Sequence, residues 1–279
     1  MKKRLFISEL KRALFNRGMF ISMLISIVLI ICYSYFHLKL WSVYELPESM
    51  KSIYENQVIA CPINYWIIYS MSPYGYYLYY LLPFIAVLPY GISFYKDCKT
   101  GYIKNILVRE KRKEYAVIRY ISVYISGGIA AVMPLLFSFI VLLPYVTWQP
   151  PNPVIMGVTP DSLEKILFNY PLLYVLIYIL LWFVMGGILS VISLMISTVN
   201  QNILTVFLSP FMIMLLIMFI QIRICVRNPF WSGRAYMPYY FLFCDNGTGI
   251  NVITAIGLVI MSISSLIVFV RLIRRKEII

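Results

Sequence analysis

The chain has 279 residues, of which 61% are hydrophobic and 13% are charged, and its formal net charge is +13 at pH 7. This composition excludes an ordinary soluble protein, and the apolar residues gather in runs of about twenty, the length that a helix needs to cross a ~30 Å hydrocarbon layer. A transmembrane β-barrel is disfavoured because its strands alternate in polarity over about ten residues, and no such series of segments occurs here.

The chain begins with a basic amphipathic segment, residues 1–18. A helix over this segment places Phe6, Ile7, Leu10, Ala13 and Leu14 on one face and basic residues on the other. The pattern predicts an interfacial helix that lies on the membrane before the chain enters its first span. The simpler alternative is a basic tag that only determines topology. The following apolar run has no small-x-small cleavage site, so we expect it to remain in the mature protein.

The apolar runs predict an all-α integral membrane protein with one transmembrane domain over residues 1–279. Proline-rich and polar segments separate the runs, so a helix is the expected structure of each run and a loop that of each interval. The six predicted transmembrane helices cover approximately residues 19–38, 76–95, 120–146, 171–197, 203–222 and 250–270.

The basic residues predict the orientation of these spans. Residues 1–18 carry six basic side chains against one acidic side chain, residues 96–119 carry eight against three, and residues 271–279 carry four against one. With six spans these three segments share a side, and the positive-inside rule makes that side the cytoplasm. Both termini are thus expected in the cytoplasm. Because all the net charge determines topology and attracts anionic lipid, nucleic-acid binding is disfavoured.

The opposite loops are predicted to lie outside. Residues 223–249 contain an apolar stretch that is too short to span, and we interpret this segment as a re-entrant or interfacial element. Cys225 and Cys244 both lie in this loop, where they either form a disulfide or remain free thiols. His37 is the only histidine, and no C-x-x-C pair occurs, so no metal site is predicted.

Motifs for catalysis and nucleotide binding are missing from the sequence. It contains no H-E-x-x-H, no G-x-S-x-G and no G-x-x-x-x-G-K-[ST], and its acidic residues lie outside the predicted spans. An enzyme or an ion-coupled carrier would need polar groups inside the membrane. We therefore expect no catalytic, cofactor-binding or metal-binding residues in this chain, and any uphill transport would need energy from another polypeptide.

The segment FYKDCKTGYIKNILVREKRKEYAVIRY, residues 94–120, resembles the first cytoplasmic loop of type-2 ATP-binding-cassette (ABC) permeases. The family pattern is an acidic residue, a glycine about four positions later, an apolar helical turn, a basic residue, and a Lys or Arg that opens the next span. The matching residues are Asp97, Gly101, Ile103, Ile106, Leu107, Arg112 and Arg119. The interval from Gly101 to Arg119 is about one residue shorter than usual, and the proline that often precedes the basic residue is missing.

The resemblance extends over the interfacial helix, the six spans and the apolar element before the last span. It implies a permease subunit of an ATP-driven exporter in a bacterial plasma membrane, paired with an identical or paralogous permease and two separate ATPase subunits that bind ATP and Mg. Residues 96–119 would form the coupling loop. Its coupling residues would be Asp97, Gly101, Ile103, Ile106, Leu107, Arg109 and Arg112. A solvated basic loop is the alternative.

Uncharged spans rich in aromatic side chains favour an amphipathic or hydrophobic substrate, best a peptide, with a lipid or a drug as alternatives. The family arrangement would place the first, second and fifth spans along the substrate path, whose expected residues are Tyr33, Tyr35, Phe36, Tyr77 and Tyr80. Ordinary helix packing is the alternative role for each tyrosine. A non-transporting assembly or immunity protein and an intramembrane enzyme are the competing functions.

Overall fold

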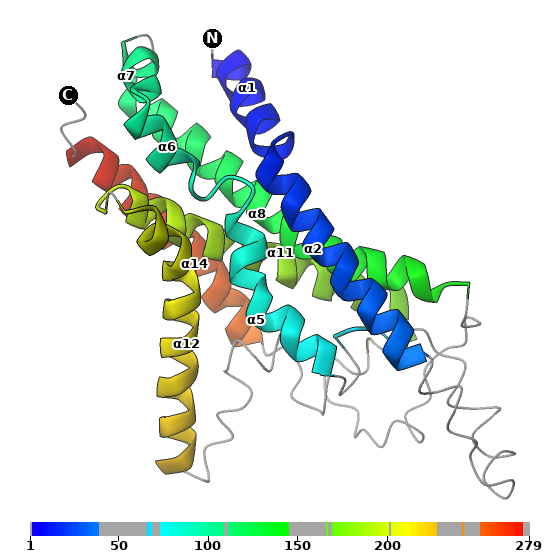
Figure 1. Ribbon diagram of the computed structural model, residues 1–279. Coiled ribbons are helices and arrows are strands. Elements are labelled where there is room, and N and C mark those ends of the chain that lie inside the picture. Colours follow the sequence, from blue (N-terminus) through cyan, green and yellow to red (C-terminus); the bar gives the residue numbers. More distant parts are fainter. Residues whose placement is uncertain are drawn as a thin grey trace, which may run out of the picture.

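The computed structural model describes residues 2–38, 66–68, 73–108, 111–144, 166, 169–200, 202–227, 242 and 252–275, and all regular structure in these residues is helical. Five helices in this part of the chain are long and apolar enough to cross a membrane. The predicted all-α, multi-pass membrane protein is therefore confirmed at this level. The helices form a bundle in which α1, α6, α7 and both chain ends lie at one end (Figure 1).

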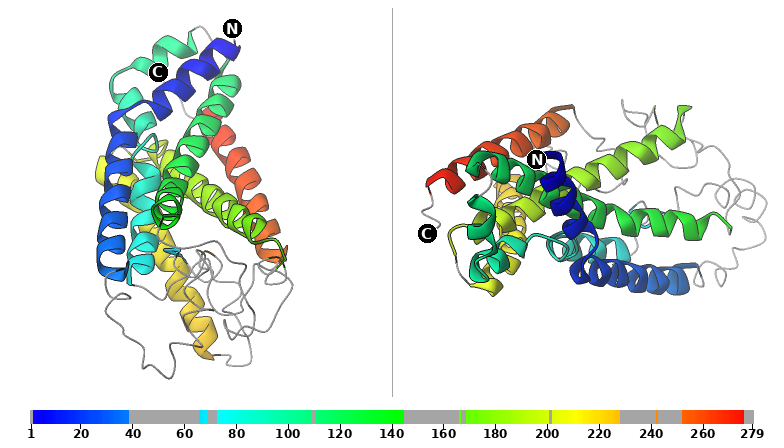
Figure 2. Two further views of the ribbon diagram at one scale, coloured as in Figure 1. Left: turned by 90° about the vertical axis from the view of Figure 1, so that its right-hand side faces the viewer. Right: turned by 90° about the horizontal axis from the view of Figure 1, so that it is seen from above.

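The amino-terminal segment forms two helices with a bend between them. Helix α1 covers Lys2–Leu14, and α2 covers Arg17–Tyr33 and continues into a short π-helix, η1, over Ser34–Leu38. Asn16 caps α2, because its side-chain oxygen accepts a hydrogen bond from the Met19 amide at 2.8 Å. This cap satisfies a helix-terminal N–H group and fixes where the new helix starts. Figure 2 shows α1 turning away from the direction of α2.

The predicted span over residues 76–95 does not form one continuous helix. Helix α5 covers Pro73–Val87 and is followed by turns over residues 88–92, after which α6 covers Ser93–Lys99. Pro89 lies in these turns, where its missing N–H and its ring oppose a continued helix. At ~1.5 Å per residue, the 15 residues of α5 rise about 22 Å, which is less than the hydrocarbon thickness.

The other long helices lie close to their predicted ranges. Helix α8 covers Arg112–Leu142 and starts eight residues before the predicted span, while α11 covers Pro171–Ser197. Helix α12 covers Ile203–Arg227 and α14 covers Val252–Arg275. The predicted loop over residues 96–119 contains helix α7, Tyr102–Leu107, and the first two turns of α8. Residues 223–227 of the predicted outer element over residues 223–249 form the end of α12, and Leu242 is buried. The rest of this element and the Cys225–Cys244 pairing lie outside the residues whose side chains are described.

Helices α8 and α11 pack closely through glycines. A Cβ atom on Gly127 would lie 2.4 Å from the Ser190 Cβ and 2.9 Å from the Gly186 carbonyl oxygen. A Cβ atom on Gly186 would lie 2.4 Å from the Ala131 Cβ. The backbones of the two helices can approach so closely only because these positions lack side chains.

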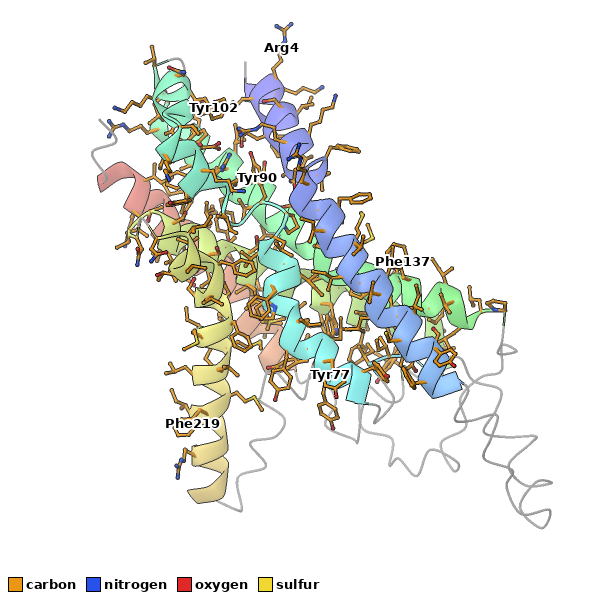
Figure 3. The ribbon with its side chains drawn as sticks, viewed as in Figure 1. Arg4, Tyr77, Tyr90, Tyr102, Phe137 and Phe219 are labelled. Atoms are coloured by element: carbon orange, nitrogen blue, oxygen red, sulfur yellow. The ribbon has the colours of Figure 1, made fainter. Side chains whose placement is uncertain are left out.

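Two apolar cores lie along the bundle. The larger core joins α2, α5, α8 and α11 and includes the fully buried Trp182. The smaller core lies at the end that carries α1, α6 and α7, and it joins Ala13, Phe94, Ile103, Tyr115 and Phe269. By contrast, α12 and α14 bury only 17% of their most apolar stretches. Their exposed side chains, such as Phe219 far from the bundle in Figure 3, suit contact with lipid or another protein surface.

Candidate functional site

Arg119 lies at the centre of a polar site beneath α6 and α7. It belongs to α8, and its side chain is fully buried. One terminal nitrogen, Nη1, donates hydrogen bonds to Glu9 Oε2 at 2.5 Å and to the Tyr90 hydroxyl at 2.7 Å. The other, Nη2, donates to Asp97 Oδ2 at 2.7 Å and to Ser93 Oγ at 2.8 Å. The planar guanidinium thus binds groups from three separate segments at once.

Helix α1 contributes two of the charged groups. Glu9 is fully buried, and its Oε2 also accepts a hydrogen bond from the Tyr90 hydroxyl at 2.8 Å. Its Oε1 accepts a hydrogen bond from Arg12 Nη1 at 3.1 Å. The predicted apolar face of α1 therefore makes up only part of its buried surface. Ala13 is buried, but Ile7 is 52% exposed, and the most buried long side chain of α1 is that of Glu9.

Asp97 of α6 completes the site. Its Oδ1 accepts a hydrogen bond from Arg12 Nη2 at 3.0 Å, and its Oδ2 accepts the bond from Arg119. Glu9, Arg119, Asp97 and Arg12 therefore form a closed ring of alternating charges, which we call the ionic cluster. Two carboxylates balance two guanidiniums, so the cluster carries no net charge. This balance is what permits Glu9, Asp97 and Arg119 to be buried together beside the partly exposed Arg12.

Two aromatic hydroxyls lie at the edge of the cluster. Burial raises the pKa of the Tyr90 hydroxyl; Arg119 opposes this shift and Glu9 adds to it, so the hydroxyl stays protonated and remains a donor. For Arg12, burial alone would lower the pKa, but Tyr90, Asp97 and Glu9 outweigh burial and raise it. The Tyr115 hydroxyl and Arg119 Nε are buried and have no hydrogen-bond partner among the described residues.

The ionic cluster has a structural role. Each carboxylate accepts bonds from two guanidiniums, so neither is available as a base or a nucleophile. What the cluster does is join α1, the turns after α5, α6 and α8 into one unit. Removing one partner from such a buried pair costs about 3–5 kcal/mol, because the other charge remains buried without compensation.

The predicted coupling residues lie on α6, α7 and the start of α8. Asp97 belongs to the ionic cluster, and Gly101 has a φ of 73°, the left-handed conformation that lets the chain turn from α6 into α7. Arg112 is exposed at the first residue of α8. Arg109 lies outside the described residues.

The apolar side of α7 was predicted to dock on another subunit, but in the structure it faces the interior of this chain. Ile103 is 1% exposed and lies in the smaller core, and Ile106 and Leu107 are partly buried against the same core. The amphipathic pattern was correct, but its apolar face packs against this chain and is not free to dock on another subunit.

A different set of side chains covers the outer surface of α7. Tyr102 is 37% exposed, Val108 is 87% exposed, and Lys104 and Asn105 are exposed between them. The Arg12 guanidinium lies 4.4 Å from the centre of the Tyr102 ring, which links this surface to the ionic cluster by a cation–π contact. Figure 3 shows Tyr102 near the tip of the bundle and Tyr90 deeper. We call Tyr102, Lys104, Asn105 and Val108 the α7 outer surface.

The structure brings together part of the predicted substrate path. Tyr74 was not included in the prediction. The centre of its ring lies 6.1 Å from the ring centre of Tyr33, 6.2 Å from that of Phe36 and 5.9 Å from that of Tyr77. Tyr33 is 1% exposed and therefore belongs to the core of this chain.

Four of the five predicted path residues are at least 36% exposed, and we call Tyr35, Phe36, Tyr77 and Tyr80 the exposed aromatic rim. Tyr35 is 58% exposed, Phe36 50%, Tyr77 55% and Tyr80 36%. Tyr35 contacts Phe36, and Tyr80 contacts Tyr79. An exposed aromatic rim thus joins the end of α2 to the start of α5.

Sequence reasoning missed Glu9, Arg12, Tyr90 and Ser93 as members of the site. One signal was available: Glu9 is the only acidic residue in a strongly basic segment, and it lies three residues from Arg12 on the same helical face. Among the described residues, no group of three or more His, Cys, Asp or Glu side chains could hold a metal ion. Comparisons with protein-family models, with curated proteins and with solved structures found no match to this chain.

Proposed function

We propose that this chain is the membrane-spanning permease subunit of an ATP-driven exporter, and that a separate ATPase subunit docks on the α7 outer surface. In this proposal the ATPase binds ATP and Mg, and the chain works as a dimer with an identical or paralogous permease. The transported molecule is amphipathic or hydrophobic, and a peptide is the best candidate.

The observation that carries the proposal is the attachment of α6 and α7 to the spans. Asp97 of α6 pairs with Arg119 of α8 inside the body, while α7 presents Val108 and Lys104 outward. A force applied to α7 would therefore reach α8 and α1 through the ionic cluster and would not be absorbed by a flexible loop. A coupling element needs this combination of an exposed contact surface and a rigid connection.

The charge of the α7 outer surface indicates the partner. Lys104 lies on it, and Lys111, Arg112 and Lys113 follow in the chain, all exposed. Val108, which lies between Lys104 and Lys111 in the chain, adds an exposed apolar side chain. A partner with an apolar cleft and an acidic rim would complement this surface in both respects.

The exposed aromatic rim supports the substrate class. Phe36 and Tyr77 both contact Tyr74 and are both at least half exposed. Both rings offer contact area to apolar groups, and Tyr77 adds a hydroxyl that can meet water, without the strong bonds that would slow release.

Co-purification of ATP hydrolysis tests the proposal. The tagged chain is isolated from membranes of its native host in mild detergent, and bound ATPase subunits are measured by ATP hydrolysis and by cross-linking to an azido-ATP. We expect retained, magnesium-dependent hydrolysis in the wild type. The variant Val108→Asp/Lys104→Glu should lose most of this hydrolysis, because it replaces an apolar and a basic side chain of the α7 outer surface with acidic ones.

Val199→Asp is the matched control, because Val199 is 76% exposed in the turn after α11. It should retain the ATPase. Absence of nucleotide-binding subunits from the wild-type preparation would overturn the proposal and favour a non-transporting membrane protein. Equal loss in both variants would move the docking surface away from α7.

A further inference from the structure

An open pocket lies at the bend between α1 and α2, beside the ionic cluster. Its volume is about 510 Å³, and it is lined by this bend, the turns after α5 and the start of α6. The residues that matter for its chemistry are Arg17, Lys96, Phe15, Ile21, Leu88 and Ile92.

Among the described residues, the lining of this cavity is cationic and includes no carboxylate. Arg12 also lines it, but its guanidinium is already bound to Glu9 and Asp97. Asn16 is engaged too: its amide nitrogen donates to the Arg12 and Ala13 carbonyls, and its oxygen caps α2. Arg17 and Lys96 are exposed, and neither has a carboxylate partner among the described residues. Their two charges are available to an anion.

The cavity also has an apolar side at membrane depth. Arg17 is the first residue of the first helix that is long and apolar enough to cross a membrane. A membrane crossed by this helix would place Arg17 where hydrocarbon gives way to headgroups. One turn further into the span, Ile21 is 48% exposed, and Phe15 before the bend is 80% exposed. A purely aqueous anion would leave these side chains uncovered, whereas a lipid would cover them.

We propose that this cavity binds one anionic phospholipid. Its phosphate lies between Arg17 and Lys96, and an acyl chain runs along Ile21 and Leu88. Each cation near an anionic membrane surface strengthens binding about fivefold, and the exposed apolar side chains add contact area that a free phosphate cannot use. The proposal does not depend on whether the chain is a transporter.

The test uses the full-length purified protein in nanodiscs and in detergent. Retention of phosphatidylglycerol against phosphatidylcholine is measured by native mass spectrometry, and affinity is measured by titrating spin-labelled phosphatidylglycerol. We expect preference for the anionic lipid, and about 25-fold weaker binding in Arg17→Gln/Lys96→Gln. The charge-preserving variant Arg17→Lys/Lys96→Arg should bind as the wild type does, which separates lost charge from lost structure.

The matched control removes two charges elsewhere. Lys3 and Arg4 are exposed on α1 and do not line the cavity, and Figure 3 shows Arg4 at the far tip of that helix. If Lys3→Gln/Arg4→Gln weakens binding as much as the cavity variant does, the lipid responds to overall charge and the site is overturned. Full competition by inorganic phosphate or by deacylated glycerophosphoglycerol would also overturn the lipid assignment, because a soluble anion would then suffice.

Discussion

The Arg119 guanidinium lies 2.5 Å from the Glu9 carboxylate, although 110 positions separate the two residues in the chain. Both side chains are fully buried. The pair therefore attaches the amino-terminal helix α1 to the spanning helix α8. Because Asp97 shares the same guanidinium, α6 is held by the same contact.

Replacing Arg119 should destabilise the protein. Arg119→Met leaves Glu9 and Asp97 buried with only Arg12 to compensate them, and we expect a loss of about 3–5 kcal/mol in the free energy of unfolding. Unfolding of the purified protein by increasing mole fractions of SDS would measure it. Lys113→Met on the exposed start of α8 is the control and should change stability by less than about 0.5 kcal/mol. Equal stability of the two variants would contradict the proposed role of the cluster.

The Glu9–Arg119 pair should show strong energetic coupling. Glu9→Gln and Arg119→Met are compared singly and together in the same unfolding assay. Because the two groups share a buried bond, the double variant should lose at least about 1.5 kcal/mol less than the sum of the single losses. Simple additivity would mean that the two residues act independently despite their contact.

The two sides of α7 should respond differently to the same substitution. Ile106→Asp places a carboxylate against the smaller core, so we expect a loss of about 2 kcal/mol or more in stability. Val108→Asp lies on the outer surface and should leave stability within about 0.5 kcal/mol while weakening retention of the ATPase. Thermal unfolding and the co-purification assay together distinguish the two effects. Destabilisation by Val108→Asp would show that this side of α7 is also packed.

The close approach of α8 and α11 should not tolerate a methyl group at Gly186. Its Cβ would lie 2.7 Å from the Gly127 carbonyl oxygen, so the two backbones must separate. We expect Gly186→Ala to cost about 1–3 kcal/mol. Gly257→Ala is the control, because outside its own helix no atom of the described residues lies within 4 Å of the added Cβ. Differential scanning fluorimetry should show a lower melting temperature for the first variant only.

The exposed aromatic rim should contribute to transport. Tyr77→Ala/Tyr80→Ala removes two aromatic contacts of ~0.5–1.5 kcal/mol each, which predicts a roughly five- to hundredfold loss in apparent substrate affinity. Substrate-stimulated ATP hydrolysis of the reconstituted complex should fall while basal hydrolysis persists. Tyr170→Ala, at an exposed residue before α11, serves as the control. Unchanged stimulation in the double variant would assign both rings to lipid contact.

Helix boundaries were predictable where a local signal in the sequence coincides with the end of an apolar run. Helix α11 begins at Pro171 and ends at Ser197, because proline favours the first turn of a helix and the apolar run stops at the polar residues that follow. The break after α5 was harder to predict. Several spans contain proline, and α8 continues through Pro134 while the chain turns at Pro89. Local sequence does not distinguish these outcomes, since neighbouring helices determine which kink is compensated.

The candidate site was only partly predictable for a similar reason. The spacing of Ile103, Ile106 and Leu107 correctly indicated an amphipathic helix, but one sequence cannot tell whether an apolar face packs on its own chain or on a partner. The burial of Glu9 was not predicted, because a carboxylate in a basic segment is usually solvated. Its burial depends on Arg119, which a distant part of the chain supplies.

The neutrality of the ionic cluster has an electrical consequence. Moving one unbalanced charge through a membrane potential changes the energy by about 2.3 kcal/mol per 100 mV. Glu9, Arg12, Asp97 and Arg119 travel together in any rigid displacement of α1, α6 and α8, and their charges cancel. Such a displacement carries no gating charge from these four residues, so the ionic cluster itself adds no voltage dependence to the equilibrium.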